Sequence, residues 1–146
     1  MAPEEKKLMS PAEEVIDWAV SFIEKFENPD EPLFVWHPQK TLDDGAMTFP
    51  CCELSPDVMD FHEGLYKKGL IIQFDWGAWK AGKNYLDNPE LLAKAPLIDC
   101  LKLLTCHVRA DRFNEGHLAS VLENGHITDI LRRMREIREA GEPIDI

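Results

Sequence analysis

The sequence contains no apolar run that approaches the roughly 20 residues of a transmembrane helix. Its first seven residues, MAPEEKK, place no apolar core behind a basic start, so they predict no secretion signal. Four cysteines are present, and Cys51 and Cys52 are adjacent, which makes them a poor disulfide unit. We therefore expect a cytoplasmic protein with free thiols and no membrane interaction.

Recognisable signatures of metal and cofactor chemistry are also lacking. The cysteines and histidines show no CxxC or HExxH spacing, and Cys100 and Cys106 fall on different sides of any helix that contains both. The sequence has no GxSxG elbow, no phosphate-binding glycine loop and no dinucleotide fingerprint. We therefore predict no metal and no cofactor.

Positive charge is scarce and unevenly placed. The chain has 16 Lys and Arg against 27 Asp and Glu, a formal net charge of -11, and every arginine lies between Arg109 and Arg138. An acidic protein repels phosphate backbones at long range, so nucleic acid is an unlikely partner on composition. The arginine-containing segment remains the place where an anion could be attracted.

The composition is that of an ordinary folded domain. Hydrophobic residues make up 45% and charged residues 29% of the 146 residues, enough to form a core without a metal or a disulfide. We interpret residues 1–9 as a flexible N-terminal tail and residues 10–146 as a single helical domain.

Helical patterning dominates that domain. Ser10-Pro11 and Ser55-Pro56 each give a serine cap followed by a proline that suits the first helical position. Apolar residues then recur three and four apart in several segments, whereas residues 33–36 and 70–74 read as extended. The predicted fold is mainly α, a compact bundle of about five helices with one or two short extended segments.

The segment from Arg109 to His117 separates two of the expected helices and concentrates charge. It contains two arginines, Asp111, Glu115 and a histidine within nine positions. If the preceding helix continues far enough, Arg112 points to the interior and forms a buried ion pair with a carboxylate, a purely structural role. Alternatively, Arg109 and Arg112 bind an anion, because guanidinium suits carboxylate and phosphate. We expect Asn114 to cap the next helix.

Several separated motifs carry a family resemblance. In chain order they are Phe74-Asp75-Trp76 with Trp79, Leu104-Thr105, Val108 to Phe113, Glu115 to Leu118, Glu123 to Ile127, and Ile130 to Arg133. With these motifs the chain resembles a bacterial and archaeal family of small proteins classified only as a domain of unknown function. The resemblance implies no activity, but it places the Asp75 motif and the arginine segment in one recurring unit.

The leading hypothesis is a non-catalytic cytoplasmic binding or accessory protein. Its partner would be a protein or a small anionic ligand that approaches the Arg109 to His117 junction. Trp76 and Trp79 could stack on a flat ligand, although large aromatic residues are also common core anchors. Asp75 beside them reads either as a desolvated carboxylate or, more simply, as a helix cap.

Two alternatives belong to other classes. The first is a small enzyme that uses Asp75, Glu115 or His117 as general base and Arg109 as anion anchor. The second is helix-turn-helix DNA binding through residues 115–139, whose last helix is basic. Two observations argue against DNA binding. The net charge of the chain is negative, and the arginines lie towards the C-terminal end of that helix.

Overall fold

The computed structural model describes residues 11–141, and these form a mainly α fold, as predicted. The proposed tail at residues 1–9 and the Ser10 cap lie outside the described residues. Five helices have seven residues or more, namely α1 (Pro11–Val20), α3 (Pro56–Lys67), α6 (Leu97–Asp111), α7 (His117–Glu123) and α8 (His126–Glu139). Three are shorter, namely α2 (Phe22–Glu27), α4 (Gly82–Leu86) and α5 (Pro89–Leu92).

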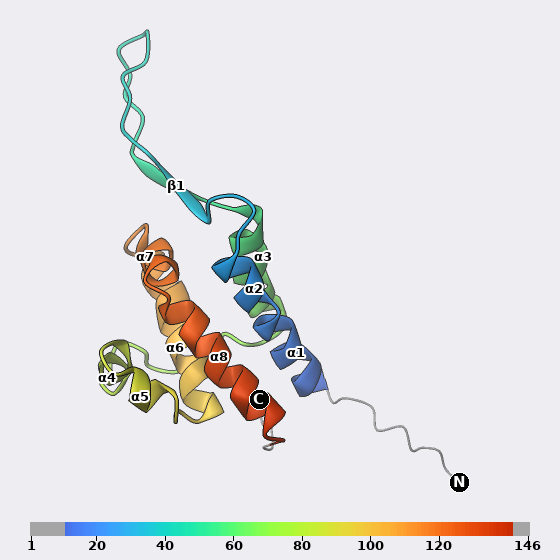
Figure 1. The fold of residues 1–146 in the computed structure, drawn as a ribbon. Helices are drawn as coiled ribbons and strands as arrows, with labels where there is room; N and C mark the ends of the chain where they lie inside the picture. The colour runs from blue at the N-terminus through green and yellow to red at the C-terminus, as the bar shows by residue number, and fades with distance from the viewer. Residues whose placement is uncertain (1–10, 142–146) are drawn as a thin grey trace.

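Helix α8 lies at the centre of the bundle. It packs against α1, α2, α5, α6 and α7, so helices from both ends of the chain meet on it (Figure 1). Its apolar residues fall at helical spacing and are almost completely buried, including Ile127, Ile130, Leu131 and Met134. Within residues 11–141, no helix combines the length and apolarity that crossing a membrane requires.

An aromatic cluster joins α1 and α2 to α3. Trp18 stacks on Phe61 with ring centroids 6.1 Å apart, and Phe22 and Phe26 pack against the same ring at 5.1 Å each. Gly64, one turn further along α3, lies directly against the Trp18 indole. This cluster holds the N-terminal helices on the side of α8 opposite to the candidate site (Figure 1).

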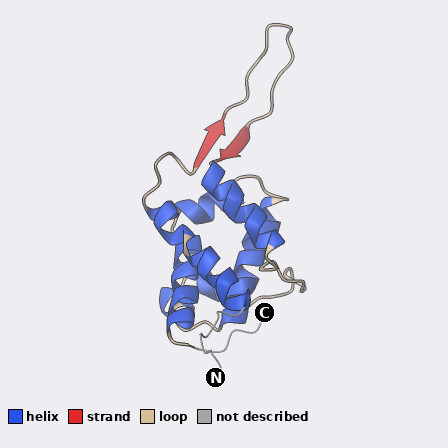
Figure 2. Cartoon of the chain, turned by 90° about the vertical axis from the view of Figure 1, so that its right-hand side faces the viewer, coloured by secondary structure: helices blue, strands red, loops and turns tan. Residues whose placement is uncertain are grey.

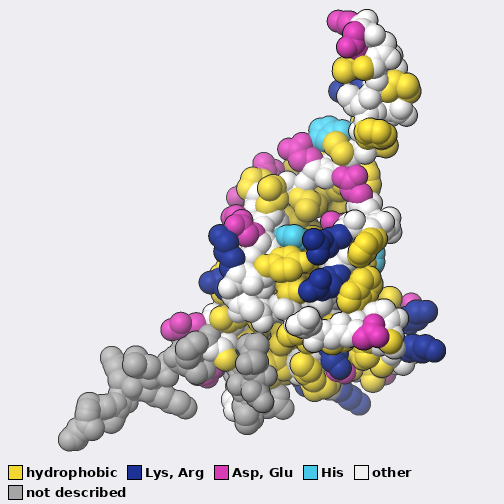
Figure 3. Space-filling view, turned by 180° about the vertical axis from the view of Figure 1, so that it is seen from behind, with side chains coloured by type: hydrophobic (Ala, Val, Ile, Leu, Met, Phe, Trp, Pro, Cys, Tyr) yellow, Lys and Arg dark blue, Asp and Glu magenta, His cyan; other side chains and the backbone are white. Residues whose placement is uncertain are grey.

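A β-hairpin projects from the helical body. Strands β1 (Phe34–His37) and β2 (Cys51–Leu54) pair antiparallel, with Phe34 opposite Leu54 and His37 opposite Cys51. The chain between them extends far from the bundle and reverses near Gly45 (Figure 2). We call residues 34–54 the arm. Hydrophobic side chains lie exposed along it among acidic ones, and Phe49 is 88% exposed (Figure 3).

The second expected extended segment, residues 70–74, does not form a strand. Leu70 is buried, and the backbone N–H of Ile72 donates to Thr105 Oγ1 at 3.1 Å. Thr105 in turn donates to the Leu101 carbonyl of α6. The segment is therefore held by a helix side chain, while the strand partner of residues 34–37 comes from residues 51–54, which the sequence did not mark as extended.

Candidate functional site

The junction between α6 and α7 is fixed by a carboxylate that reaches across it. Asp111, the last residue of α6, accepts a hydrogen bond at 3.0 Å from the backbone N–H of Leu118 in the first turn of α7. The prediction that the Asn114 side chain caps this helix is wrong. Asn114 contributes only its backbone carbonyl, which accepts a hydrogen bond from the N–H of His117. Asp111 caps α7 from outside the helix.

The predicted buried ion pair of Arg112 is not formed. Arg112 is exposed, and neither it nor Arg109 forms an ion pair with a carboxylate among residues 11–141. The helical periodicity that directed Arg112 inward does not apply, because α6 ends at Asp111. The two arginines lie beside the junction rather than inside it.

Glu115 and Gly116 connect the junction to the arm. Glu115 Oε2 accepts a hydrogen bond at 3.0 Å from the backbone N–H of Cys52 on β2. Gly116 has a φ of 94°, and the Trp36 indole of β1 occupies the space where a Cβ atom would stand. Glu115 is thus engaged in holding the arm, which weakens its candidacy as a general base.

Three histidines gather where α6, α7 and α8 meet. His107 Nδ1 lies 3.0 Å from His117 Nε2, and the His107 ring packs edge-on against His126 with centroids 5.0 Å apart. Burial, together with the neighbouring His126 and His117, lowers the pKa of His107 to about 3. Burial also lowers the pKa of His126, although Asp129 opposes the shift. His107 is therefore a neutral ring at pH 7.

A cavity of about 260 Å³ opens beside this cluster. We call it the tryptophan cleft. Its walls come from the segment before α6 and from the facing sides of α6 and α7, and the lining residues are Trp76, Gly77, Trp79, Gly82, Lys83, Leu86, Leu103, Cys106, His107, Ala110 and His117. The lining is mostly apolar and aromatic, with a few polar groups, which is typical of small-molecule sites.

The charge around the cleft is positive. Lys83 lines it, and Lys102 Nζ lies 5.4 Å from the centroid of the Trp79 ring. Lys102, Cys106 and Arg109 are spaced four and three residues apart on α6, so Arg109 shares the edge of the helix that borders the cleft. Lys and Arg side chains also stand among hydrophobic ones near the middle of the rear face (Figure 3). Among the described residues that line the cleft, none is a carboxylate.

Asp75 does not line the cleft, although its carboxylate lies near Gly77, which does. Its side chain is exposed, so it is not the buried carboxylate that the sequence offered as one interpretation. The residues that follow form a turn instead of the helix that Asp75 was expected to cap, and its backbone carbonyl accepts from the N–H of Ala78 at 3.2 Å.

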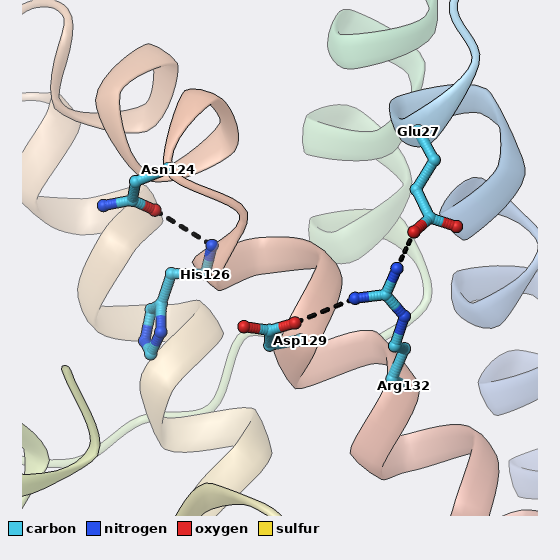
Figure 4. A network of polar contacts seen from close by, with 5 residues as sticks. All are labelled: Glu27, Asn124, His126, Asp129 and Arg132. Carbon is cyan, nitrogen blue, oxygen red and sulfur yellow. Dashed lines mark hydrogen bonds and ion pairs between the residues drawn. The ribbon is translucent and has the colours of Figure 1, made fainter. Parts of the chain in front are cut away.

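The helix-turn-helix interpretation is weakened because three of the four arginines of α8 contact the protein itself. Arg132 pairs with Glu27 and Asp129, Arg133 donates to the Ala95 carbonyl, and Arg138 pairs with Glu13 and Asp17. Figure 4 shows the Arg132 guanidinium between its two carboxylates. Since α8 is also the central helix of the bundle, it has no broad free face for a DNA groove.

Comparison with known families confirms the resemblance to a family of unknown function. The model of a family of unknown function (DUF6508) matches residues 11–140. The chain belongs to this family. No curated protein and no solved structure matches it. This is the kind of family that the sequence resembled, and membership of it implies no activity.

In this DUF6508 chain, the structure brings together only part of the predicted site. Trp76, Trp79 and His117 line one cleft. Arg109 does not line it but follows Cys106 by three residues on α6. Sequence reasoning missed Lys83 and Cys106 as cleft residues. It considered His107 only as a residue near His117 in sequence that could act as a base or metal ligand, and the contact between the two rings appears only in the structure.

Proposed function

We propose that this protein is a non-catalytic binding protein for a small aromatic anion, held in the tryptophan cleft. One observation carries the proposal. Trp76, Trp79 and His117, three residues singled out by sequence, line a single cavity whose charged lining residue is cationic. An aromatic ring can stack on indole, while an anionic group lies near Lys83 and the α6 cations.

The histidine pair supports a binding role for His117. His107 is buried and neutral, and its contact with His117 Nε2 fixes the orientation of that ring. His117, half-buried in the cleft wall, can then present its other nitrogen to a ligand. This is the pre-organised, sparse polar contact that gives specificity in an otherwise apolar pocket.

The same geometry gives less support to an enzyme. A histidine base is usually oriented by a carboxylate, whereas the ring bonded to His117 is another histidine. Glu115 is hydrogen-bonded to the arm, and Asp75 is exposed and does not line the cleft. We further propose a cytoplasmic location, since all four cysteines are unpaired and reducing compartments keep thiols in that form.

The experiment uses 2-naphthoate as the probe. Its binding is measured by isothermal titration calorimetry and by changes in the indole N–H signals of a ¹H–¹⁵N spectrum. We expect saturable binding that shifts the Trp76 and Trp79 signals but leaves that of Trp18 unchanged. Lys102→Gln should weaken binding several-fold, because it removes a cation from the rim, whereas Lys40→Gln on the arm should not. Absence of binding at millimolar probe, or shifts spread over all four indoles, would overturn the proposal.

A further inference from the structure

The arm leaves a set of large hydrophobic side chains exposed to solvent. Phe49 and Met47 are 88% and 59% exposed, and Val35, Trp36 and Leu42 are also exposed. A two-stranded ribbon that stands alone is only marginally stable in water, and its outer edges lack backbone partners. Apolar surface of this extent on a projecting element is typical of an interaction site.

The helical body carries an exposed aromatic side chain of its own, beside two cations. Phe113 is 82% exposed, and one face of its ring stacks on Trp76 with centroids 6.3 Å apart. Arg109, Arg112 and Phe113 are three and four positions apart, so they share one face of the turn that ends α6. Neither arginine forms an ion pair within residues 11–141. We call these three residues the arginine patch.

The charge of the arm is opposite to that of the arginine patch. The arm contains Asp43, Asp44 and Glu53 against a single lysine, Lys40. At the tip, Asp44 Oδ1 accepts a backbone N–H at 2.9 Å and so shapes the turn, whereas Asp43 forms no ion pair with any described residue. The acidic and apolar groups of the arm therefore complement the cationic and aromatic groups of the patch.

The arm points away from the patch of its own chain. Its base is fixed at the junction, where Glu115 accepts from the Cys52 N–H and the Trp36 indole packs against Gly116. Phe113 precedes Glu115 by two positions, so the patch lies near the base of the arm, while the tip extends far from the bundle (Figure 2). The tip can therefore contact an arginine patch only on another molecule.

We propose that this other molecule is a second copy of the chain, in a dimer in which the two arms lie antiparallel. Because the base of each arm lies beside a patch, antiparallel arms of equal length bring each tip to the patch of the other copy. A two-fold axis repeats the contact, and the assembly closes. The arm, residues 34–54, is close to the roughly 20 to 30 residues that each partner contributes to a standard interface. This inference goes beyond the proposed function and does not depend on it.

Other occupants fit these surfaces less well. If the arms paired only with each other, their apolar side chains would be covered, but Phe113 and both guanidinium groups of the patch would stay exposed. An acidic tip would also be repelled by nucleic acid or by an anionic membrane. A second copy covers the arm and the patch at once.

The test measures the molar mass and the dissociation constant of the full chain by light scattering and sedimentation. We expect a dimer at roughly 100 μM protein. Asp43→Lys reverses a charge at the tip while keeping the Asp44 bond that shapes the turn, and Arg112→Glu reverses a charge in the patch. Each should weaken the dimer by about tenfold, because a two-fold assembly contains each substitution twice and brings like charges together. Asp60→Lys on α3 and Arg135→Glu on α8 make the same changes at exposed positions elsewhere and should have no effect.

The decisive measurement mixes the two charge-reversed variants. In the mixed dimer the reversed tip meets the reversed patch, and the unaltered tip meets the unaltered patch, so the affinity should return to nearly that of the wild type. A monomeric wild type, an Arg112→Glu variant that dimerises as well as the wild type, or a mixture that recovers no affinity would each overturn the proposal. Both substituted side chains are exposed, so the circular dichroism of each variant should match that of the wild type.

Discussion

His107 Nδ1 lies 3.0 Å from His117 Nε2, so two imidazole rings from consecutive helices share one hydrogen bond. One ring must donate and the other accept, which requires at least one neutral ring. His107 supplies it, because it is 4% exposed and its pKa is lowered to about 3. The contact joins the end of α6 to the start of α7 and makes the stability of the bundle depend on keeping His107 uncharged.

The first prediction concerns pH. The folded-state pKa of His107, about 3, lies below the ordinary value of 6.5, so between these two values the unfolded chain binds more protons. The free energy of unfolding should therefore fall as pH falls through this window, and His107 alone should remove about 2 kcal/mol between pH 7 and pH 5. Burial acts on His126 in the same direction. Urea unfolding at a series of pH values measures the slope.

The control for this prediction replaces one histidine at a time. His107→Gln introduces a polar side chain of similar size that cannot be protonated. The slope of the free energy of unfolding against pH should therefore become shallower, by an amount that corresponds to at most one bound proton. His62→Gln on α3, which is not part of the cluster, should leave the slope as it is. An unaltered slope in His107→Gln would show that His107 does not carry the pH dependence.

The helices could be predicted from sequence because their determinants are local. Ser55 does cap α3, accepting from the backbone N–H of Val58, and the apolar stripe of α8 is buried as its spacing predicts. The arm could not be predicted from sequence, because strand pairing depends on contacts between residues that are distant in sequence. β2 is recognisable only through its partner β1, seventeen residues earlier, and through Glu115, which accepts from the N–H of Cys52 at 3.0 Å.

The candidate site was predicted in part for a similar reason. Trp76, Trp79 and His117 carry chemistry that can be recognised from residue type, and they do converge. The pairing of charges could not be read from the sequence, because ion-pair partners are chosen by the tertiary fold. Arg112 was predicted to form a buried ion pair yet is exposed, whereas Arg138 pairs with Asp17, 121 positions earlier.

A second prediction tests how the arm is attached. Gly116→Ala should destabilise the protein more than Gly125→Ala does. Both glycines have positive φ, 94° and 84°, so each alanine pays about 1 to 2 kcal/mol for the left-handed conformation. Only at Gly116 would the new methyl group also displace an indole, that of Trp36, since nothing lies within 4 Å at Gly125. The Trp36 indole N–H signal should shift in Gly116→Ala alone. Equal losses would contradict the packing shown here.

A third prediction distinguishes the two residues that could cap α7. Asp111→Ala should lower the free energy of unfolding by about 1 kcal/mol, because the Leu118 N–H loses its acceptor. Asn114→Ala should cost much less, since Asn114 contributes only its backbone carbonyl to that turn. Urea unfolding of the two variants, side by side, makes the comparison. A larger loss of stability in Asn114→Ala than in Asp111→Ala would show that Asn114 caps α7, as the sequence predicted.

The last prediction concerns Gly64, in the middle of α3. Alanine in a helix interior normally stabilises a protein relative to glycine, by about 0.5 to 1 kcal/mol. Here the added methyl group would overlap the Trp18 indole, which stacks on Phe61, so we expect Gly64→Ala to destabilise by about 1 to 3 kcal/mol. The double variant Trp18→Phe/Gly64→Ala gives the control, because the smaller ring leaves room for the methyl group. Its loss should be smaller than the sum of the two single losses, and strict additivity would show that Gly64 and Trp18 are not in contact.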